Sequence, residues 1–251
     1  MSRSTTFSEK KIVLLLTSAI DVKGIKFSVI NSTDERYAEY HSALIQWSRC
    51  PSIKSIIFCD NSNYDLSEFK MSVKDLGDSE KFEFYSYEGQ EFSRELGKGY
   101  GEITTFEYVW SHSKAFNNAD IILKVNGRYF IENINEVIHK LICCDSFVIG
   151  DFRKNLTWMD SRIFAFQPVF FEKYFLPFKE KINDSEGLMF EMALARSVHQ
   201  AMSDGFDWEM MPAVPVIKGK SGSTGRVYSR FGIRRLIKLF YLKLCRYILR
   251  R

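Results

Sequence analysis

Two short groups of residues combine side chains that bind phosphate. The first is KVNGR, residues 124–128, which follows the apolar residues 121–123. Burying cations at the end of a strand is costly unless an anion meets them. Arg128 can hold a phosphate through two parallel hydrogen bonds, Lys124 adds a point charge, and Asn126 adds a neutral hydrogen-bonding group. This spacing predicts an anion site, with a turn carrying two solvated cations as the alternative.

The second group is GKGYGE, residues 97–102, which opens a helical pattern. Gly99 and Gly101 would let the backbone approach a phosphate closely, and exposed amides at a helix start bind anions. Lys98 adds a positive charge beside them. The group matches neither a P-loop nor a dinucleotide-binding fingerprint, and a glycine-rich loop without a ligand is the alternative. Because only one helix separates it from KVNGR, the two groups together favour phosphate binding.

Transfer of a chemical group to a hydroxyl requires a carboxylate as general base. The candidates near expected strand ends and helix starts are Asp151, Asp160, Glu186 and Glu191. Their residue types and positions do not rank these four carboxylates. For each of them, a surface ion pair or a charge at a helix start is the alternative. We find no Ser/His/Asp or Cys/His set in the sequence.

The elements that position these residues alternate along the chain. Residues 11–20 form a continuous apolar run, which predicts a central strand covered on both faces. Further strands are expected within 52–65, 81–89, 119–125, 146–152 and 161–171, and helices at 33–49, 97–116, 132–144 and 185–202. This alternation predicts an α/β fold with a mixed, mostly parallel sheet flanked by helices. Ligands of such sheets bind beyond the carboxyl ends of the strands, where KVNGR, TSAIDV and CDNSNYD are expected.

Composition narrows the class of protein. The chain has 251 residues, of which 45% are hydrophobic and 15% aromatic, so it can bury one large core and is not globally disordered. Its five cysteines show no metal-binding or disulfide spacing, which favours reduced thiols in a cytosolic compartment. The apolar run near the amino end is too short for a signal peptide or a membrane span.

Charge is distributed unevenly along the chain. Residues 210–251 contain eleven Lys or Arg and no Asp or Glu, which leaves 24 basic and 31 acidic residues in 1–209. Residues 229–251 predict a helix with an apolar stripe and a basic side, interrupted too often by charge to span a bilayer. Such a helix is typical of an anchor on an anionic membrane surface. A dimerisation helix and a nucleic-acid-binding tail are the alternatives, and the wide apolar face disfavours nucleic acid.

Residues 218–228 form a Gly- and Ser-rich stretch that contains Lys220, Ser221 and Ser223. Such a segment can fold over a bound phosphate and exclude water, as lids do, or it can be a simple linker. The chain is therefore divided into a domain of residues 1–217, a flexible loop of 218–228 and a membrane-surface helix of 229–251.

The order of these motifs resembles bacterial surface-polysaccharide glycosyltransferases, the sugar transferases of capsule and O-antigen (lipopolysaccharide) gene clusters. The resemblance rests on the first strand with its polar loop, the CDNS strand end, the GKGYGE helix start, the GRY strand end, DSRIF and the SGSTG loop, and it covers most of the chain. It implies a GT-A-like domain that binds a nucleotide-sugar. Many GT-A enzymes hold a divalent metal with an Asp-x-Asp motif where this chain has Lys124, Asn126 and Arg128, a poor set of ligands for Mg²⁺ or Mn²⁺.

The resemblance implies a role for each candidate residue. Asp21 and Asp60 would contact the nucleoside, and Glu102 and Arg162 would contact the donor or acceptor sugar. Asp160 is the first choice as catalytic base or as a group that binds a sugar hydroxyl, and Glu191 is the second. The residues expected to bind the diphosphate are Lys98, Gly99, Gly101, Lys124, Asn126 and Arg128. No metal or other cofactor is expected, because the cations would offset the charge of the leaving diphosphate directly.

We therefore expect an enzyme that transfers a sugar from a nucleotide-sugar, expected to be UDP-linked, to a lipid-linked glycan on the inner face of the cell membrane. Its partners would be the nucleotide-sugar, the lipid-linked acceptor and the anionic membrane surface, without nucleic acid. Two alternatives remain open. One is a nucleotidyltransferase acting on a sugar phosphate, and the other is a peripheral membrane protein that binds phosphorylated glycan or lipid without turnover.

Overall fold

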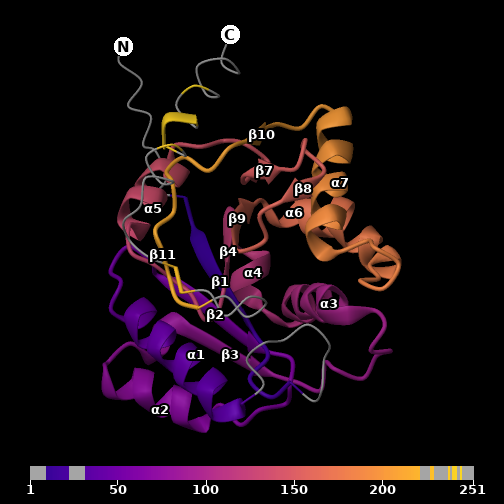
Figure 1. Cartoon of the computed structure of the whole chain (residues 1–251). Helices are drawn as coiled ribbons and strands as arrows, with labels where there is room; N and C mark the ends of the chain where they lie inside the picture. Colours follow the sequence, from indigo (N-terminus) through magenta and orange to yellow (C-terminus); the bar gives the residue numbers. More distant parts are fainter. Residues whose placement is uncertain are drawn as a thin grey trace, which may run out of the picture.

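A seven-stranded mixed sheet forms the centre of the molecule (Figure 1). The structure, a computed structural model, describes residues 10–22, 32–220, 227–228, 237, 239–241 and 244. The strands of this sheet are β1 (Ile12–Ser18), β2 (Ser55–Asp60), β3 (Phe82–Ser86), β4 (Ile121–Asn126), β6 (Val148–Ile149), β9 (Ile163–Phe166) and β10 (Trp208–Glu209). Their order is β10-β6-β9-β4-β1-β2-β3. Neighbouring strands are parallel except that β9 runs antiparallel to β4 and β6, which confirms the predicted mixed, mostly parallel sheet.

The central strand β1 explains why the sheet has helices on both faces. All seven residues of β1 are buried. Leu14 and Leu16 contribute to one apolar cluster, whereas Val13 and Leu15 contribute to another on the opposite face. Successive side chains of a strand point to opposite faces. The apolar run therefore supplies both cores.

The helices form two layers around the sheet. They are α1 (Thr33–Ser48), α2 (Ser67–Asp75), α3 (Gly97–His112), α4 (Lys114–Asn117), α5 (Ile134–Ile142), α6 (Pro168–Phe170) and α7 (Phe190–Ser203), with the short 3₁₀ turns η1 (Ser79–Lys81) and η3 (Leu176–Lys181) and the π-helical turn η2 (Phe171–Phe175). Helices α1, α2 and α5 pack on one face of the sheet, and α3, α4, α6 and α7 pack on the other. The sheet is thus the middle of three layers (Figure 1).

Several predicted elements differ from the observed ones. The single helix expected at 97–116 is broken at Ser113, whose backbone is extended and whose hydroxyl accepts the amide of Phe116 and so caps α4. The strand expected at 161–171 ends at Phe166, because Pro168 begins helix α6. The strand expected at 146–152 is two strands, β6 and β7 (Phe152–Arg153), separated at Gly150. The sequence pattern also missed α2.

Two small antiparallel ribbons extend from the main sheet. β7 pairs with β8 (Trp158–Met159), and β5 (Phe130–Ile131) pairs with β11 (Ile217–Lys218). The second ribbon brings the residues that precede the Gly- and Ser-rich stretch next to the end of β4. Beyond it Lys220 bridges to Val227, and the amide of Tyr228 donates to the carbonyl of Gly219 at 3.0 Å. The ends of the predicted loop therefore lie together near KVNGR.

Parts of two sequence predictions lie outside the described residues. Ser221 and Ser223 of the predicted lid loop are among them, as is most of the predicted helix 229–251. Residues 237, 239–241 and 244 of that segment are described, and all five are helical. Within the described ranges, we find no helix with the length and apolar content needed to cross a bilayer.

Candidate functional site

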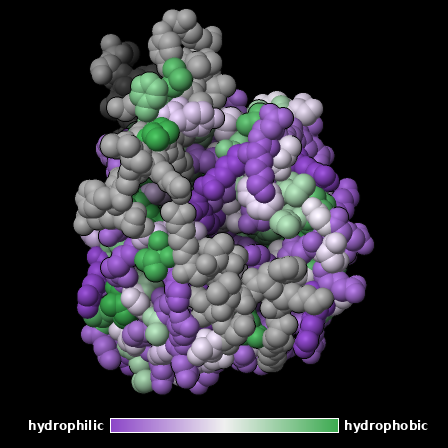
Figure 2. All heavy atoms as spheres, in the orientation of Figure 1, coloured by the Kyte–Doolittle hydropathy of each residue, from purple (hydrophilic) through white to green (hydrophobic). Residues whose placement is uncertain are grey.

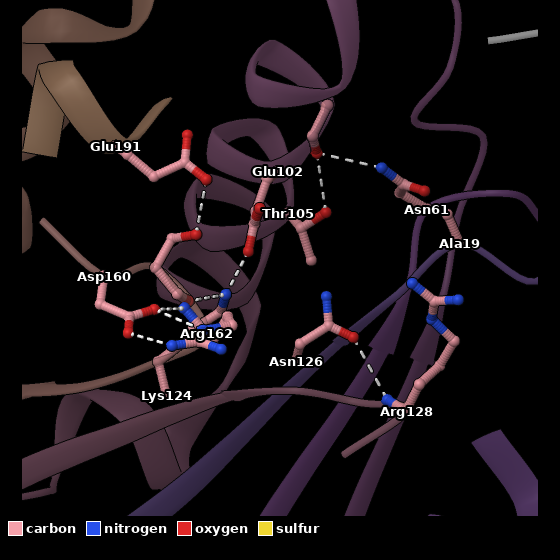
Figure 3. A network of polar contacts seen from close by, with 12 residues as sticks. Ala19, Asn61, Glu102, Thr105, Lys124, Asn126, Arg128, Asp160, Arg162 and Glu191 are labelled. Atoms are coloured by element: carbon pink, nitrogen blue, oxygen red, sulfur yellow. Dashed lines mark hydrogen bonds and ion pairs between the residues drawn. The ribbon is translucent and has the colours of Figure 1, made fainter. Parts of the chain in front are cut away.

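Polar residues from five segments of the chain meet at the carboxyl ends of β1, β2 and β4. Figure 3 shows Asn61, Glu102, Asn126, Asp160 and Glu191 arranged around one region, with cationic side chains between them. The face shown in Figure 2 is hollowed near its centre, in the region where Figure 1 shows β4 and β9, and hydrophilic atoms border the hollow. This edge is where an α/β sheet binds ligands.

Lys124 of β4 is nearly completely buried and has partners within the chain. Its side chain is 1% exposed, and its ammonium group forms an ion pair with Glu102 of α3. The same group donates to the carbonyl of Ser161 at 2.7 Å. The two phosphate-binding groups seen in the sequence, KVNGR and GKGYGE, therefore contact each other through this ion pair. A diphosphate could bind Lys124 directly only by displacing these partners.

Arg128 is buried but has fewer partners than its donors could use. One guanidinium nitrogen, Nη1, donates to Glu39 at 3.1 Å, and the side chain is 6% exposed. Among the described residues, its Nε has no hydrogen-bond acceptor. Burial alone would lower the pKa of Arg128, but Tyr40, Tyr129 and Glu39 raise it overall, so the group remains charged. A buried cation with an unused donor is suited to meeting an anion.

The turn after β4 fixes the position of Arg128. The amide of Gly127 donates to the carbonyl of Thr17 in β1 at 2.9 Å. A Cβ on Gly127 would lie 2.8 Å from that same carbonyl oxygen, so only glycine allows the approach. Asn126 accepts the amide of Arg128 at 3.3 Å (Figure 3). Figure 3 shows the guanidinium of Arg128 directed toward the end of β1, near Ala19.

The start of α3 already has a carboxylate from the chain beside it. The amide of Gly99 donates to Asp184 at 3.5 Å, and a Cβ on Gly97 would collide with the Asp184 carboxylate. Burial raises the pKa of Asp184, while the backbone amide of Gly99 and the charge of Lys98 lower it in part. Gly101 packs against the ring of Phe92, 3.1 Å from the position of a Cβ. Phosphate binding at these glycines stays a prediction; in the structure the carboxyl group beside them is that of Asp184.

The ends of β1 and β2 are held together by Asp60. Its carboxylate is fully buried and accepts the amides of Ile20 and Ser62, both at 2.8 Å, as well as the hydroxyls of Ser18 and Ser62. Because both oxygens of Asp60 already accept hydrogen bonds from these loops, Asp60 is better suited to shaping the loops than to the predicted contact with a nucleoside. Asp21, predicted for the same role, is partly exposed on the loop after β1, and its amide donates to Ser62.

Two amide side chains near these loops were not singled out in the sequence. Asn61 donates to the carbonyl of Gly101 at 3.0 Å, and Gln90 donates to the carbonyl of Asp21 at 2.8 Å. Within the described part of the chain, the side-chain oxygens of both are buried without a donor. Asn61 belongs to the CDNS stretch, which could have drawn attention to it, whereas Gln90 carries no sequence signal. Both oxygens can accept hydrogen bonds.

Asp160 is engaged by two arginines. It accepts Arg162 Nε and Nη2 at 2.8 and 2.6 Å and Arg153 Nη2 at 2.5 Å, and it is 6% exposed. Burial lowers the pKa of Arg162, but the hydrogen bond to Asp160 raises it overall. A carboxylate whose oxygens are held by guanidinium groups is a weak base. These contacts suit Asp160 to positioning Arg162 and Arg153 rather than to acting as the base, the role for which it was the first choice.

Glu191, in the first turn of α7, has the properties of a base. Burial raises its pKa, and the charge of Glu102 raises it further. One carboxylate oxygen accepts the hydroxyl of Ser161 at 2.9 Å, and Figure 3 shows the other directed away from Ser161. Of the remaining carboxylate candidates, Glu186 is exposed before α7, and Asp151 is buried and accepts the amide of Met211. Glu191 and Glu102 thus form an acidic pair with Lys124 and Ser161 between them.

The residues at the end of β4 do not fit a divalent cation. Lys124 and Arg128 are cationic, and Asn126 offers a single amide oxygen. Elsewhere in the described ranges, no three His, Cys, Asp or Glu residues are grouped as metal ligands. Mg²⁺ and Mn²⁺ prefer carboxylate and carbonyl oxygens. The chemistry of this donor set therefore argues against a metal at the position where KVNGR lies.

No protein-family model matches the sequence, and no curated protein matches it. Three similar solved structures illustrate the fold. A mannosyltransferase from Pyrobaculum calidifontis, in complex with GDP-mannose and Mn²⁺, has a TM-score of 0.51 at 7% identity over 82% of this chain and 56% of its own. A cytidylyltransferase from Leptospira borgpetersenii has a TM-score of 0.48 at 10% identity over 94% and 96%. Staphylococcus aureus TarS (1–349) has a TM-score of 0.46 at 10% identity over 82% and 59%.

The likeness to the mannosyltransferase concerns the fold alone, since identity is only 7%. This chain spans about half of the length of that protein, 56%. In this chain, the seven-stranded sheet with helices on both faces positions the polar residues at the carboxyl ends of its strands. The chain has the GT-A-like fold that its motif order predicted.

Proposed function

We propose that this protein is a glycosyltransferase that moves a sugar from a nucleotide-sugar to a hydroxyl of a lipid-linked surface-polysaccharide acceptor in bacteria. The single observation that carries the proposal is Arg128. Its guanidinium is buried at the end of β4, beside the end of β1, and its Nε has no acceptor among the described residues. A donor diphosphate would supply that acceptor. The GT-A-like fold and the polar edge of the sheet support the same assignment.

The diphosphate develops negative charge as its bond to the anomeric carbon breaks. Arg128 would hold one of its oxygens, and Asn126 would fix the turn that carries Arg128. Lys124, neutralised in part by Glu102, would stabilise the diphosphate through the electric field of its charge rather than through a direct contact. Preorganised cations of this kind stabilise a leaving group without having to reorganise. We propose that transfer is independent of a divalent metal, because the donor set at β4 does not suit one.

Glu191 is the proposed base of the reaction. The acceptor hydroxyl gives its proton to Glu191 as its oxygen forms a bond to the anomeric carbon, and the diphosphate leaves with the electron pair of the broken bond. Glu102, with a side chain that is 22% exposed, would bind sugar hydroxyls together with Arg162. Asp160 would orient Arg162 through its two hydrogen bonds to that guanidinium. Glu102 pairs with Lys124, which donates to the carbonyl of Ser161. The hydroxyl of Ser161 in turn donates to Glu191, so the two glutamates belong to one hydrogen-bonded network.

The nucleoside would bind at the loops after β1 and β2. The buried oxygens of Asn61 and Gln90 can accept hydrogen bonds from the N–H groups of a base, and Asp21 lies on the adjacent loop. Asp60 holds both loops in place. Uracil presents one ring N–H between two carbonyl groups, and one of these two buried oxygens would accept that N–H. We propose UDP as the nucleotide carrier on this ground.

Isothermal titration of the full chain with UDP, GDP and CMP tests the proposal. UDP should bind, and Arg128→Ala should weaken its binding by about tenfold or more, the loss expected when a charge-assisted hydrogen bond is removed. The matched control is Arg196→Ala, since Arg196 is exposed on α7 away from KVNGR. If none of the nucleotides binds at millimolar concentration, the transferase assignment fails and a non-catalytic glycan- or lipid-binding protein is favoured.

Chelation tests the metal-free part separately. Transfer by the full chain should persist in excess EDTA. If EDTA abolished transfer and Mn²⁺ restored it, the metal-independent mechanism would be wrong, whereas the transferase assignment would stand. The two parts of the proposal therefore fail on different observations.

A further inference from the structure

Four large apolar side chains near the carboxyl end are exposed together. Ile237, Phe240, Tyr241 and Leu244 are 62%, 70%, 58% and 46% exposed. All four are helical, and their spacing of three, one and three residues is that of a single helix face. Single exposed apolar residues are common on protein surfaces, but a contiguous group of this size marks an interaction site. We call these four residues the apolar stripe.

The side chain of Leu239 shows which way the apolar stripe faces. Leu239 is half-buried and packs on a small cluster formed by Met210 and Val214. At 3.6 residues per turn, Leu239 lies roughly half a turn from the centre of the apolar stripe. The side of these helical residues that contains Leu239 therefore packs on the body of the protein, and the apolar stripe faces away from the body. In Figure 1 these residues form the yellow ribbon at the top, and Figure 2 shows green, hydrophobic spheres there.

The charge of the surrounding sequence selects the occupant. Residues 229–251 contain eight Lys or Arg and no Asp or Glu. A second copy of this chain would bring the same positive charge to the interface, and like charges oppose such a contact. A nucleic acid would be attracted by the charge but offers little to an exposed Ile, Phe and Leu. An anionic lipid bilayer is negatively charged at its headgroups and apolar beneath them. It therefore matches both the positive charge of the segment and the exposed apolar side chains.

We propose that the apolar stripe docks on an anionic lipid bilayer, lying in the plane of the headgroups. The apolar side chains enter the boundary between headgroups and acyl chains, and the basic residues of the segment attract the acidic lipids. This inference does not depend on the proposed transferase activity. If both hold, docking places the enzyme on the surface that contains a lipid-linked acceptor.

Sedimentation of the full chain with lipid vesicles tests this proposal. The probes are vesicles of phosphatidylcholine alone and vesicles that also contain phosphatidylglycerol at about one lipid in three. The protein should bind the anionic vesicles and release them at high salt. Phe240→Ser/Leu244→Ser should weaken binding by about tenfold or more, because two large apolar side chains no longer enter the bilayer. The control Met71→Ser/Met202→Ser, which changes side chains that are 59% and 42% exposed on α2 and α7, should bind as the unaltered protein does.

Three results would overturn the proposal. The first is vesicle binding that is unchanged in Phe240→Ser/Leu244→Ser. The second is equal binding to neutral vesicles, which would remove the role of charge. The third is a stable dimer in size-exclusion chromatography that becomes a monomer in the double variant, which would identify a second copy as the occupant. Titration with UDP keeps the two proposals separate. The double variant should bind UDP as the unaltered protein does. If the unaltered protein does not bind UDP, the transferase is refuted and the docking surface is not.

Discussion

Lys124 of β4 and Glu102 of α3 form an ion pair across 22 positions of the sequence, and the lysine side chain is 1% exposed. A charge buried to this extent requires a partner, because water cannot solvate it. The pair therefore joins the sheet to the helix that follows the glycine-rich stretch. The ammonium group of Lys124 also donates to the carbonyl of Ser161, and the hydroxyl of Ser161 donates to Glu191.

Replacement of Lys124 by methionine should lower the free energy of unfolding by about 3–5 kcal/mol, the cost of breaking a buried ion pair by removing one partner. The double variant Lys124→Met/Glu102→Gln should recover part of that loss, since no unpaired carboxylate remains. Urea unfolding measures both. The control is Lys140→Met, because Lys140 and Glu136 form an exposed pair in α5, and there the change should stay within about 0.5 kcal/mol. Equal losses at the two sites would show that the buried pair has no special role.

Glu191→Gln should change stability and activity in opposite directions. Burial and the charge of Glu102 raise the pKa of Glu191, so the folded protein favours the protonated form. The stability that this preference provides is complete below the pKa of an unfolded glutamate, about 4.3, and is lost as pH rises through the higher pKa of the folded state. The variant should therefore melt at a higher temperature than the unaltered protein near neutral pH, with no difference in acid.

The same substitution removes the proposed base, and sugar transfer should fall by about 100-fold or more. Transfer by the unaltered protein should rise with pH, with a midpoint above the usual range for a carboxylate. Thermal unfolding at several pH values and steady-state rates provide the two measurements. A variant that retained full activity would exclude Glu191 as the base, whatever its stability.

Gly97→Ala and Gly77→Ala form a matched pair that isolates the contact with Asp184. Both glycines have a φ of +78°, so each alanine costs about 1–2 kcal/mol for the left-handed backbone. Nothing lies within 4 Å of a Cβ on Gly77, whereas a Cβ on Gly97 collides with the Asp184 carboxylate. Gly97→Ala should therefore lose about 1–3 kcal/mol more than Gly77→Ala, the usual cost of overpacking. Chemical denaturation of both variants gives the difference, and equal values would mean that Asp184 moves aside freely.

Asp60→Asn should disrupt the loops after β1 and β2. Both carboxylate oxygens of Asp60 accept a backbone amide, from Ile20 and Ser62, and an asparagine must present its NH₂ group to one of them. The unpaired amide should cost about 1–3 kcal/mol. In the control Asp65→Asn, a single oxygen accepts Ser67, so asparagine retains the contact and the change should stay within about 0.5 kcal/mol. Thermal melts and UDP titration of both variants would reveal the effect, and a normal Asp60→Asn protein would contradict it.

The sheet and most of its helices could be predicted because burial leaves a strong local signal. The seven buried residues of β1 are a continuous apolar run, and the strands β2 and β4 carry similar runs. Errors arose where one residue decides the boundary. Pro168 ends a strand pattern by starting a helix, and Ser113 interrupts a helix pattern by capping the next one. Both residue types have known positional preferences, so closer attention to them would have improved these boundaries.

The partners of the charged residues could not be predicted. The types and spacing of Lys124, Arg128 and Gly99 predict a bound phosphate, which stays a prediction. They do not indicate that Glu102, Glu39 and Asp184 of the same chain contact them. These contacts join segments far apart in sequence, and one sequence contains no record of such pairing. The two arginines that hold Asp160 and the burial of Glu191 could not be predicted for the same reason. The surroundings of each carboxylate depend on tertiary packing rather than on its neighbours along the chain.

The position of β4 between a parallel and an antiparallel neighbour gives the protein an order of assembly. During synthesis Glu102 leaves the ribosome before Lys124, and the carbonyl of Ser161 follows 37 residues after Lys124. The parallel strands β1, β2, β3 and β4 are therefore complete while the ammonium group still lacks one of its two oxygen partners. Arrival of β9 closes this gap, and α7 then adds Glu191. The growing chain therefore acquires Ser161 and Glu191 after the parallel strands and Lys124 are complete.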